Sequence, residues 1–184
     1  MGNHEYGLMR FENITQEIAR MLGVAYGGLS CKVALCDDNG QSWTKLFLCH
    51  ASKNKLTSAS KDPVQRKANM LASLKQSLQN KASDCQLMAC GHTHKLLVLP
   101  PTPLLVMGDD GTELTSGYTP AGAHADGYIL PEARWYANTG SFLRTNVVGE
   151  ETYAELLGYD PVDLGWIKVT IEDYRIANVE AVQI

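Results

Sequence analysis

Two apolar runs joined by a turn signal constrain the fold of this chain more than any other feature of its sequence. The runs are SCKVALC (residues 30–36) and WTKLFLC (residues 43–49), and DDNGQS separates them. Asn39-Gly40 is a strong hairpin-turn signal between two strand-like runs. The sequence therefore predicts an antiparallel strand pair whose second strand ends just before His50.

A helix is predicted on each side of this hairpin. Asn13 is the expected cap of the first helix, ITQEIARML, which has one apolar face and stops at Gly23. Asp62-Pro63 is the expected cap and first residue of the second helix, which extends to about Asn80. Its apolar residues recur at helical spacing, so one side of it is expected to face the core.

Strand-like runs continue beyond the second helix. QLMAC leads directly into GHTH, LLVLP and PLLVM follow, and RWYAN precedes TGSF. WIKVTIED and IANVEAV favour a final hairpin. This order of helices and strands favours a layered α/β arrangement. No repeat, low-complexity segment or linker divides the chain, so we expect a single domain over residues 1–184.

Composition excludes several classes of function and location. The chain of 184 residues has a net charge of −4, so it lacks a broad basic field and would meet nucleic acid only as a substrate. Its five cysteines form no C-x-x-C pair, which indicates free thiols in a reducing compartment. Cys49 and Cys90 are expected in the core. With no signal peptide and no membrane-spanning run, a cytoplasmic location and no membrane partner are expected.

Polar residues with metal-binding chemistry follow the strand-like runs or open the chain. They are Asn3 and His4 in GNHE, His50 after LFLC, and His92 and His94 in GHTH. Neutral imidazole is the commonest protein metal ligand, and the amide oxygen of asparagine binds the same divalent ions. A mixed nitrogen and oxygen site favours Mn, Fe or Zn over Ca or Mg. Each motif alone is weak evidence, whereas the ordered set is much stronger.

In this order the motifs resemble those of the calcineurin-like metallophosphoesterases. That family carries D-x-H, G-D-x-x-D, G-N-H-D/E, a single His and G-H-x-H, and this chain has the last three, at Gly2–Glu5, His50 and Gly91–His94. The later YANTGSF resembles the strand and N-x-G-S turn that often follow G-H-x-H, so the resemblance extends to about Arg144. It implies an α/β fold, part of a four-layer α/β/β/α sandwich.

The resemblance also implies ligands for two divalent metal ions. Asn3, His50 and His92 would bind one ion, and His94 would bind the other. In such sites the two ions lie about 3.5–4 Å apart and activate a hydroxide that attacks phosphorus in line. The implied activity is therefore hydrolysis of a phosphate monoester or diester, a phosphatase-type hydrolase reaction.

Two further residues of GNHE receive roles from the same resemblance. His4 would not bind metal, but would stabilise or protonate the leaving group, a role that suits histidine because the ordinary pKa of an imidazole lies close to neutral pH. Glu5 would orient a neighbouring histidine.

The first two motifs of the family, D-x-H and G-D-x-x-D, are absent, and with them the carboxylate that bridges both metals. Asp109 and Asp110 follow GHTH in a turn-like segment and are not placed in the site. We therefore expect the C-terminal part of a metallophosphoesterase, without the first strands and helices of its sandwich. Alone, it should bind at most one metal ion, with modest affinity, and show little turnover. The open sheet edge left behind predicts self-association or pairing with the missing N-terminal part.

Three functions remain open on the sequence. The first is a metal-dependent phosphoesterase of unknown substrate, for which the long segment Gly108–Pro131 is a candidate specificity element. The second is a non-catalytic interaction protein that retains part of the fold. The third is a metal-binding regulator that uses the histidines.

Overall fold

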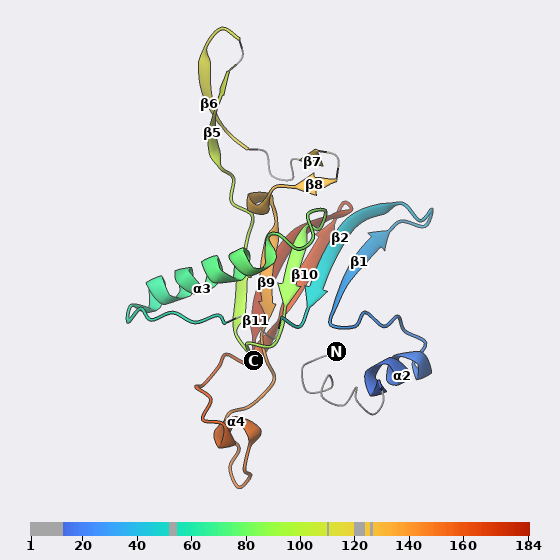
Figure 1. The fold of residues 1–184 in the computed structure, drawn as a ribbon, viewed down its shortest axis with the longest axis vertical. Helices are drawn as coiled ribbons and strands as arrows, with labels where there is room; N and C mark the ends of the chain where they lie inside the picture. The colour runs from blue at the N-terminus through green and yellow to red at the C-terminus, as the bar shows by residue number, and fades with distance from the viewer. Residues whose placement is uncertain (1–12, 52–54, 110, 120–123, 126) are drawn as a thin grey trace.

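A mixed five-stranded sheet lies between a helix on one face and a two-stranded sheet on the other (Figure 1). The structure is a computed structural model, and it describes residues 13–51, 55–109, 111–119, 124–125 and 127–184. The α/β architecture predicted from the sequence is confirmed in this part of the chain.

The elements follow in chain order. They are α2 (Ile14–Met21), β1 (Ser30–Cys36), β2 (Ser42–Cys49), α3 (Pro63–Leu78), β3 (Leu87–Cys90), β4 (Leu96–Leu99), β5 (Leu105–Asp109), β6 (Leu114–Tyr118), β7 (His124–Ala125), β8 (Tyr128–Ile129), η1 (Pro131–Ala133), β9 (Trp135–Thr139), α4 (Tyr153–Leu156), β10 (Gly165–Glu172) and β11 (Arg175–Gln183).

The predicted hairpin of β1 and β2 is confirmed, and its turn explains the sequence between the strands. The amide of Gly40 donates to the carbonyl oxygen of Asp37 over 3.0 Å, and Gly40 has φ +80°. The carboxylate of Asp37 accepts from the amides of Asn39 and Gln41, each over 2.9 Å. These contacts define a type I turn closed by a left-handed glycine, one of the common hairpin connections.

Strand order in the main sheet is β1-β2-β3-β9-β4. β2, β3 and β9 are parallel, and β1 and β4 pair antiparallel with β2 and β9 at the two edges. The register places Cys49 beside Cys90 and Cys90 beside Asn138. The carboxyl ends of the three parallel strands therefore lie level at one edge of the sheet.

The core has two parts because both faces of the sheet are covered. On one face, α3 packs on the sheet through Leu74 and Leu78, which contact the cluster that includes Met88. On the other face, Leu87 packs with Val179 of the β10–β11 hairpin. β3 is buried along its whole length, as expected for a central parallel strand covered on both sides.

The final hairpin predicted from the sequence is also confirmed. β10 and β11 pair antiparallel, and Asp173 and Tyr174 connect them with φ +47° and +61°. Positive φ at both positions is the signature of a type I′ turn, whose twist matches that of the strands it joins.

The segment between β4 and β9 forms two small hairpins, β5–β6 and β7–β8. All residues of β5 and β6 are exposed. Figure 1 shows β5–β6 projecting from the end of the sheet opposite to the one where β2 and β9 end. The described residues of the candidate specificity segment, Gly108–Pro131, therefore lie away from that edge.

Both predicted helix caps are present. The side-chain oxygen of Asn13 accepts from the amide of Gln16 over 3.1 Å, and that of Asp62 accepts from the amide of Val64 over 3.0 Å. Each cap satisfies one of the amides that the first turn of a helix leaves without a partner. Among the described residues, no helix has the length and apolar character needed to cross a membrane.

Arg134 is fully buried and joins α3 to the start of β9. Its guanidinium donates to the carbonyl oxygens of Gln79 and Ile129, each over 2.8 Å, and lies 5.5 Å from the centre of the Tyr128 ring. Gln79 is the C-cap of α3, where carbonyl groups lack helical partners and carry partial negative charge. The positive charge of Arg134 is therefore buried against backbone carbonyl groups that accept its hydrogen bonds.

Asp84 joins the first two strands to the segment that leads into β3. Its carboxylate lies 2.7 Å from the ammonium of Lys32 and 3.0 Å from that of Lys45. Hydrogen bonds from these two lysines lower the pKa of Asp84 from 3.8 to about 2.

We predict that Arg134→Ala lowers the free energy of unfolding by about 3 kcal/mol, because several buried carbonyl groups lose their donor. Arg134→Lys should fall between this variant and the wild type, because it keeps the charge but loses the planar fork. Urea denaturation followed by tryptophan fluorescence measures the effect. The control is Arg20→Ala on the exposed face of α2, expected within about 0.5 kcal/mol of wild type. Equal stability of the two alanine variants would contradict the role given to Arg134.

A pH dependence follows from Asp84. The folded state lowers the pKa of this group, so its contribution is complete above the usual value of 3.8 and is lost as the pH falls toward about 2. Since the two lysines are partly exposed, we expect a contribution of about 1 kcal/mol at neutral pH. The difference in unfolding free energy between wild type and Asp84→Asn should shrink between these two pH values. A difference that stays constant through this window would exclude the ion pairs as its source.

Candidate functional site

The carboxyl ends of β2 and β3 bring two predicted ligands together. The amide of His50 donates to the carbonyl oxygen of Leu29 over 3.0 Å, and the amide of Gly91 donates to that of Cys49 over 3.1 Å. These backbone contacts continue the sheet by one residue beyond each strand. His50 and His92 thus lie at the edge where parallel α/β sheets usually bind ligands.

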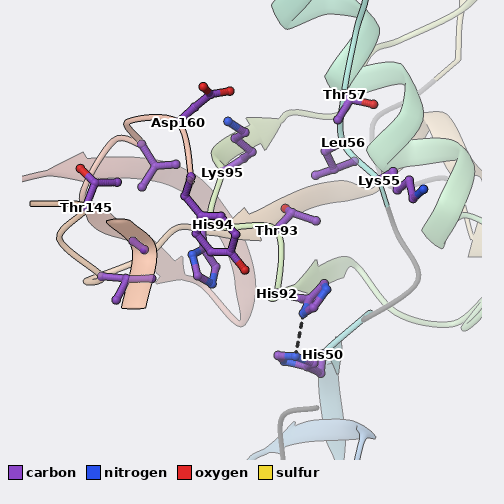
Figure 2. A pocket seen from close by; sticks show the side chains of 14 residues that line it. His50, Lys55, Leu56, Thr57, His92, Thr93, His94, Lys95, Thr145 and Asp160 are labelled. Carbon is purple, nitrogen blue, oxygen red and sulfur yellow. Dashed lines mark hydrogen bonds between the residues drawn. The ribbon is translucent and has the colours of Figure 1, made fainter. Parts of the chain in front are cut away.

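His50 and His92 contact each other directly (Figure 2). Nε2 of His50 lies 3.1 Å from Nδ1 of His92, and the ring centroids are 4.9 Å apart with the planes inclined by 70°. Two nitrogens at this separation either share one proton in a hydrogen bond or direct their lone pairs at a common cation.

This geometry fits a divalent metal ion. Two imidazole nitrogens bound to one Zn²⁺ lie at most about 4.2 Å apart, because each bond is about 2.0–2.1 Å long. The observed 3.1 Å is within this limit. Within the described ranges of the chain, no three or more His, Cys, Asp and Glu residues are grouped closely enough to hold a metal. The described residues therefore place two imidazole nitrogens close enough together for one cation, and no third such side chain beside them.

His94 lines the same cavity as the pair but faces a different wall. Its ring lies 6.0 Å from the ring of Tyr159 in an edge-to-face arrangement. Figure 2 shows His94 on the side of Thr145 and Asp160, apart from the contact between His50 and His92. The structure thus brings together two of the three described histidines that the sequence analysis proposed as ligands.

Asn3, His4 and Glu5, the residues that the GNHE motif placed in the site, lie outside the described residues. Cys49 and Cys90 pack in the cluster under α3, as predicted for core residues. Burial raises the pKa of the Cys49 thiol, which disfavours the thiolate that metal binding would require.

The GHTH loop contains backbone conformations that only glycine adopts easily. His92 has φ +81° and His94 has φ +56°, so both are in the left-handed region. Gly91 opens this loop, but the left-handed residues are the two histidines that follow it. Such conformations cost about 1–2 kcal/mol each, and persist where surrounding contacts hold them.

Asn138 provides one of those contacts, and its role could not be read from the sequence. The side chain is fully buried at the end of β9, and its amide nitrogen donates to Oγ1 of Thr93 over 2.8 Å. Thr93 lies between the two strained histidines. Its place in the N-x-G-S sequence is typical of a turn former, yet its side chain bonds across the sheet edge to the GHTH loop. Among the described residues, its Oδ1 is buried without a hydrogen-bond partner.

The turn that follows Asn138 needs its glycine. Gly140 has φ +76°, and a Cβ there would lie 2.7 Å from the carbonyl oxygen of Gly165. The amide of Gly140 donates to the carbonyl oxygen of Lys95 over 3.2 Å, which ties this turn to the end of the GHTH loop. The N-x-G-S sequence therefore supports the site edge from one side.

A cavity of about 400 Å³ opens beside the histidine pair. One wall comes from the GHTH loop and the segment before α3, and the other from the segment around α4 (Figure 2). The lining residues are His50, Lys55, Leu56, Thr57, His92, Thr93, His94, Lys95, Leu143, Thr145, Ala154, Tyr159, Asp160 and Val162. No described residue of the 108–131 segment is among them.

Comparison of the chain with known protein families, proteins and structures gives no assignment for this site. No protein-family model matches the chain, and no curated protein or solved structure matches it. The functional conclusion therefore rests on the sequence motifs and on the geometry of the cavity.

Proposed function

We propose that this chain supplies the histidine side of a metal-dependent phosphoesterase site of the calcineurin-like metallophosphoesterase type. One observation carries the proposal: His50 and His92, from two separate motifs in the family's order, have ring nitrogens 3.1 Å apart at the carboxyl ends of parallel strands. A cavity of about 400 Å³ beside them has room for a substrate. The reaction proposed is hydrolysis of a phosphate monoester or diester.

The layers of the described fold support the same proposal. α3, the main sheet and the β10–β11 hairpin form three successive layers. We propose that they are part of a four-layer α/β/β/α sandwich, in which β10–β11 belongs to the second sheet.

In this site His50 and His92 would hold one divalent ion, Mn, Fe or Zn, with Asn3 as a third ligand. His94, proposed to bind a second ion, lines the cavity next to them. When bound, the metal would supply Lewis-acid charge at the phosphoryl group and acidified water. Asn138 would act as a positioning residue, because its bond to Thr93 fixes the loop that carries His92.

Metal titration tests this assignment. We predict that the chain binds a single Mn²⁺ or Zn²⁺ ion with modest affinity in isothermal titration calorimetry. His50→Ala and His92→Ala should each weaken binding by at least about tenfold, because each removes a direct ligand. The matched control is His124→Ala in β7, a strand near the end of the main sheet opposite to the histidine pair (Figure 1).

Two outcomes of the titration would contradict the proposal. One is metal binding that all three variants reduce equally, and the other is binding that none of them reduces. Hydrolysis of p-nitrophenyl phosphate with added Mn²⁺ should be slow or absent for this chain alone. Fast turnover would show that the carboxylates of the absent motifs are not needed.

The role of Asn138 predicts an effect of a substitution that touches no proposed ligand. Thr93→Val removes the acceptor of the Asn138 amide and leaves a buried donor unpaired, so it should destabilise the fold by about 1–3 kcal/mol. It should also weaken metal binding by about 10- to 100-fold, as loss of supporting contacts around metal ligands does. Thr145→Val, on the opposite wall of the cavity, is the control. Unchanged metal affinity in Thr93→Val would show that the contact is structural only.

A further inference from the structure

The cavity beside the histidine pair carries positive charge in a chain that is acidic overall. Lys55 and Lys95 both line it, against a net charge of −4 for the whole chain. Neither lysine forms an ion pair with any residue that the structure describes. Asp160 is the one carboxylate among the described lining residues, so the charged side chains of the wall favour an anion.

Hydroxyl groups and apolar side chains complete the lining. Thr57, Thr93 and Thr145 provide hydroxyls that can donate to phosphate oxygens. The ring of Tyr159 adds an aromatic surface for a flat group to stack on. The apolar part of the lining consists of Leu56, Leu143, Ala154 and Val162.

The two lysines lie in different parts of the wall. Figure 2 shows Lys55 next to Leu56 and Thr57 on one side of Thr93, and Lys95 on the other side with Asp160. A ligand whose phosphate faces the histidine pair therefore has a lysine residue in the wall on each side. One lysine can pair with that phosphate, and the other is available to a second anionic group.

We propose that the cavity binds a small phosphoester that carries a second anionic group and a compact apolar or aromatic body. That the bound ester is hydrolysed rests on the proposed function, whereas the binding itself needs only the cavity walls. The volume of about 400 Å³ is at the small end of the range of roughly 300–1,000 Å³ for small-molecule sites. A single nucleotide-sized molecule fits this description, and a polymer does not.

Binding to the full chain in the presence of EDTA separates this proposal from metal chemistry. The probes are adenosine diphosphate, adenosine monophosphate, adenosine and inorganic pyrophosphate, measured by isothermal titration calorimetry. We expect the diphosphate to bind most tightly, because it alone combines two phosphates with an aromatic body. Pyrophosphate binding as tightly as the diphosphate would overturn the role of the apolar wall. Adenosine binding as tightly would overturn the role of the lysines.

Variants locate the site. Lys55→Gln and Lys95→Gln should each weaken binding of adenosine diphosphate by about tenfold, since each removes a charged contact. The matched controls are Lys61→Gln and Lys67→Gln, which alter exposed lysines just before α3 and within it and should leave binding unchanged. Lys95→Arg should retain much of the affinity, which separates loss of charge from a folding defect. Equal effects of all the glutamine variants would overturn the proposal.

Two further measurements complete the test. The double variant His50→Ala/His92→Ala should lose metal binding, whereas Lys95→Gln should lose affinity for the diphosphate and keep metal binding. If the proposed phosphoesterase function fails, the metal titration fails and the nucleotide titration does not. A short single-stranded oligonucleotide that binds more tightly than the diphosphate would overturn the small-molecule assignment.

Discussion

The register of three parallel strands is the constraint on which the candidate site depends. Cys49, Cys90 and Asn138 lie level across β2, β3 and β9, so the residues that follow them meet at one edge. A slip of one residue would turn every side chain of a strand to the other face and separate the two imidazoles. At the opposite end of β3, Gln86 fixes this register, because its side-chain oxygen accepts from the amide of Lys45 over 2.8 Å. The backbone amide of Gln86 also donates to the carbonyl oxygen of Lys45 over 2.9 Å.

Two buried polar side chains, Arg134 and Asn138, support opposite ends of the sheet. Arg134 satisfies carbonyl groups at the end of α3 and attaches this helix to the start of β9. Asn138, four residues later and within β9, bonds to Thr93 and supports a loop with two left-handed histidines. β9 and the residue before it thus carry both the anchor of the covering helix and the support of the site. A well-packed strand can hold strained neighbouring backbone because its own conformation is determined along its whole length.

Local features of the fold could be predicted from the sequence, because each depends on a few neighbouring residues. The caps at Asn13 and Asp62 and the turn at Gly40 are of this kind. The insertion of β9 between β3 and β4 is not, since pairing order depends on contacts between distant segments.

The same limit applies to the site. Strand ends and motif order predicted that residues 50 and 92 converge. The orientation of His94 toward Tyr159 and the bond from Asn138 to Thr93 depend on segments some 45 or more residues away in the chain. No local pattern encodes such contacts. Arg134 illustrates the point. An arginine before an apolar strand is typical of an exposed position, but here the side chain is buried and donates to distant carbonyl groups.

One side of the cavity is built on strands of the main sheet, and the other side on irregular segments. The histidine pair follows strands of the central sheet, whereas Lys55, Tyr159 and Asp160 lie on irregular segments outside it. Residues on loops can be substituted without disturbing the main sheet, and the strand register of that sheet holds the histidine pair in place. Substitutions in the segments around Lys55 and Tyr159 should therefore alter which ligand the cavity accepts, while the imidazole contact persists. In the proposed site, chemistry and ligand choice would thus be carried by separate parts of the chain, and each can be tested without changing the other.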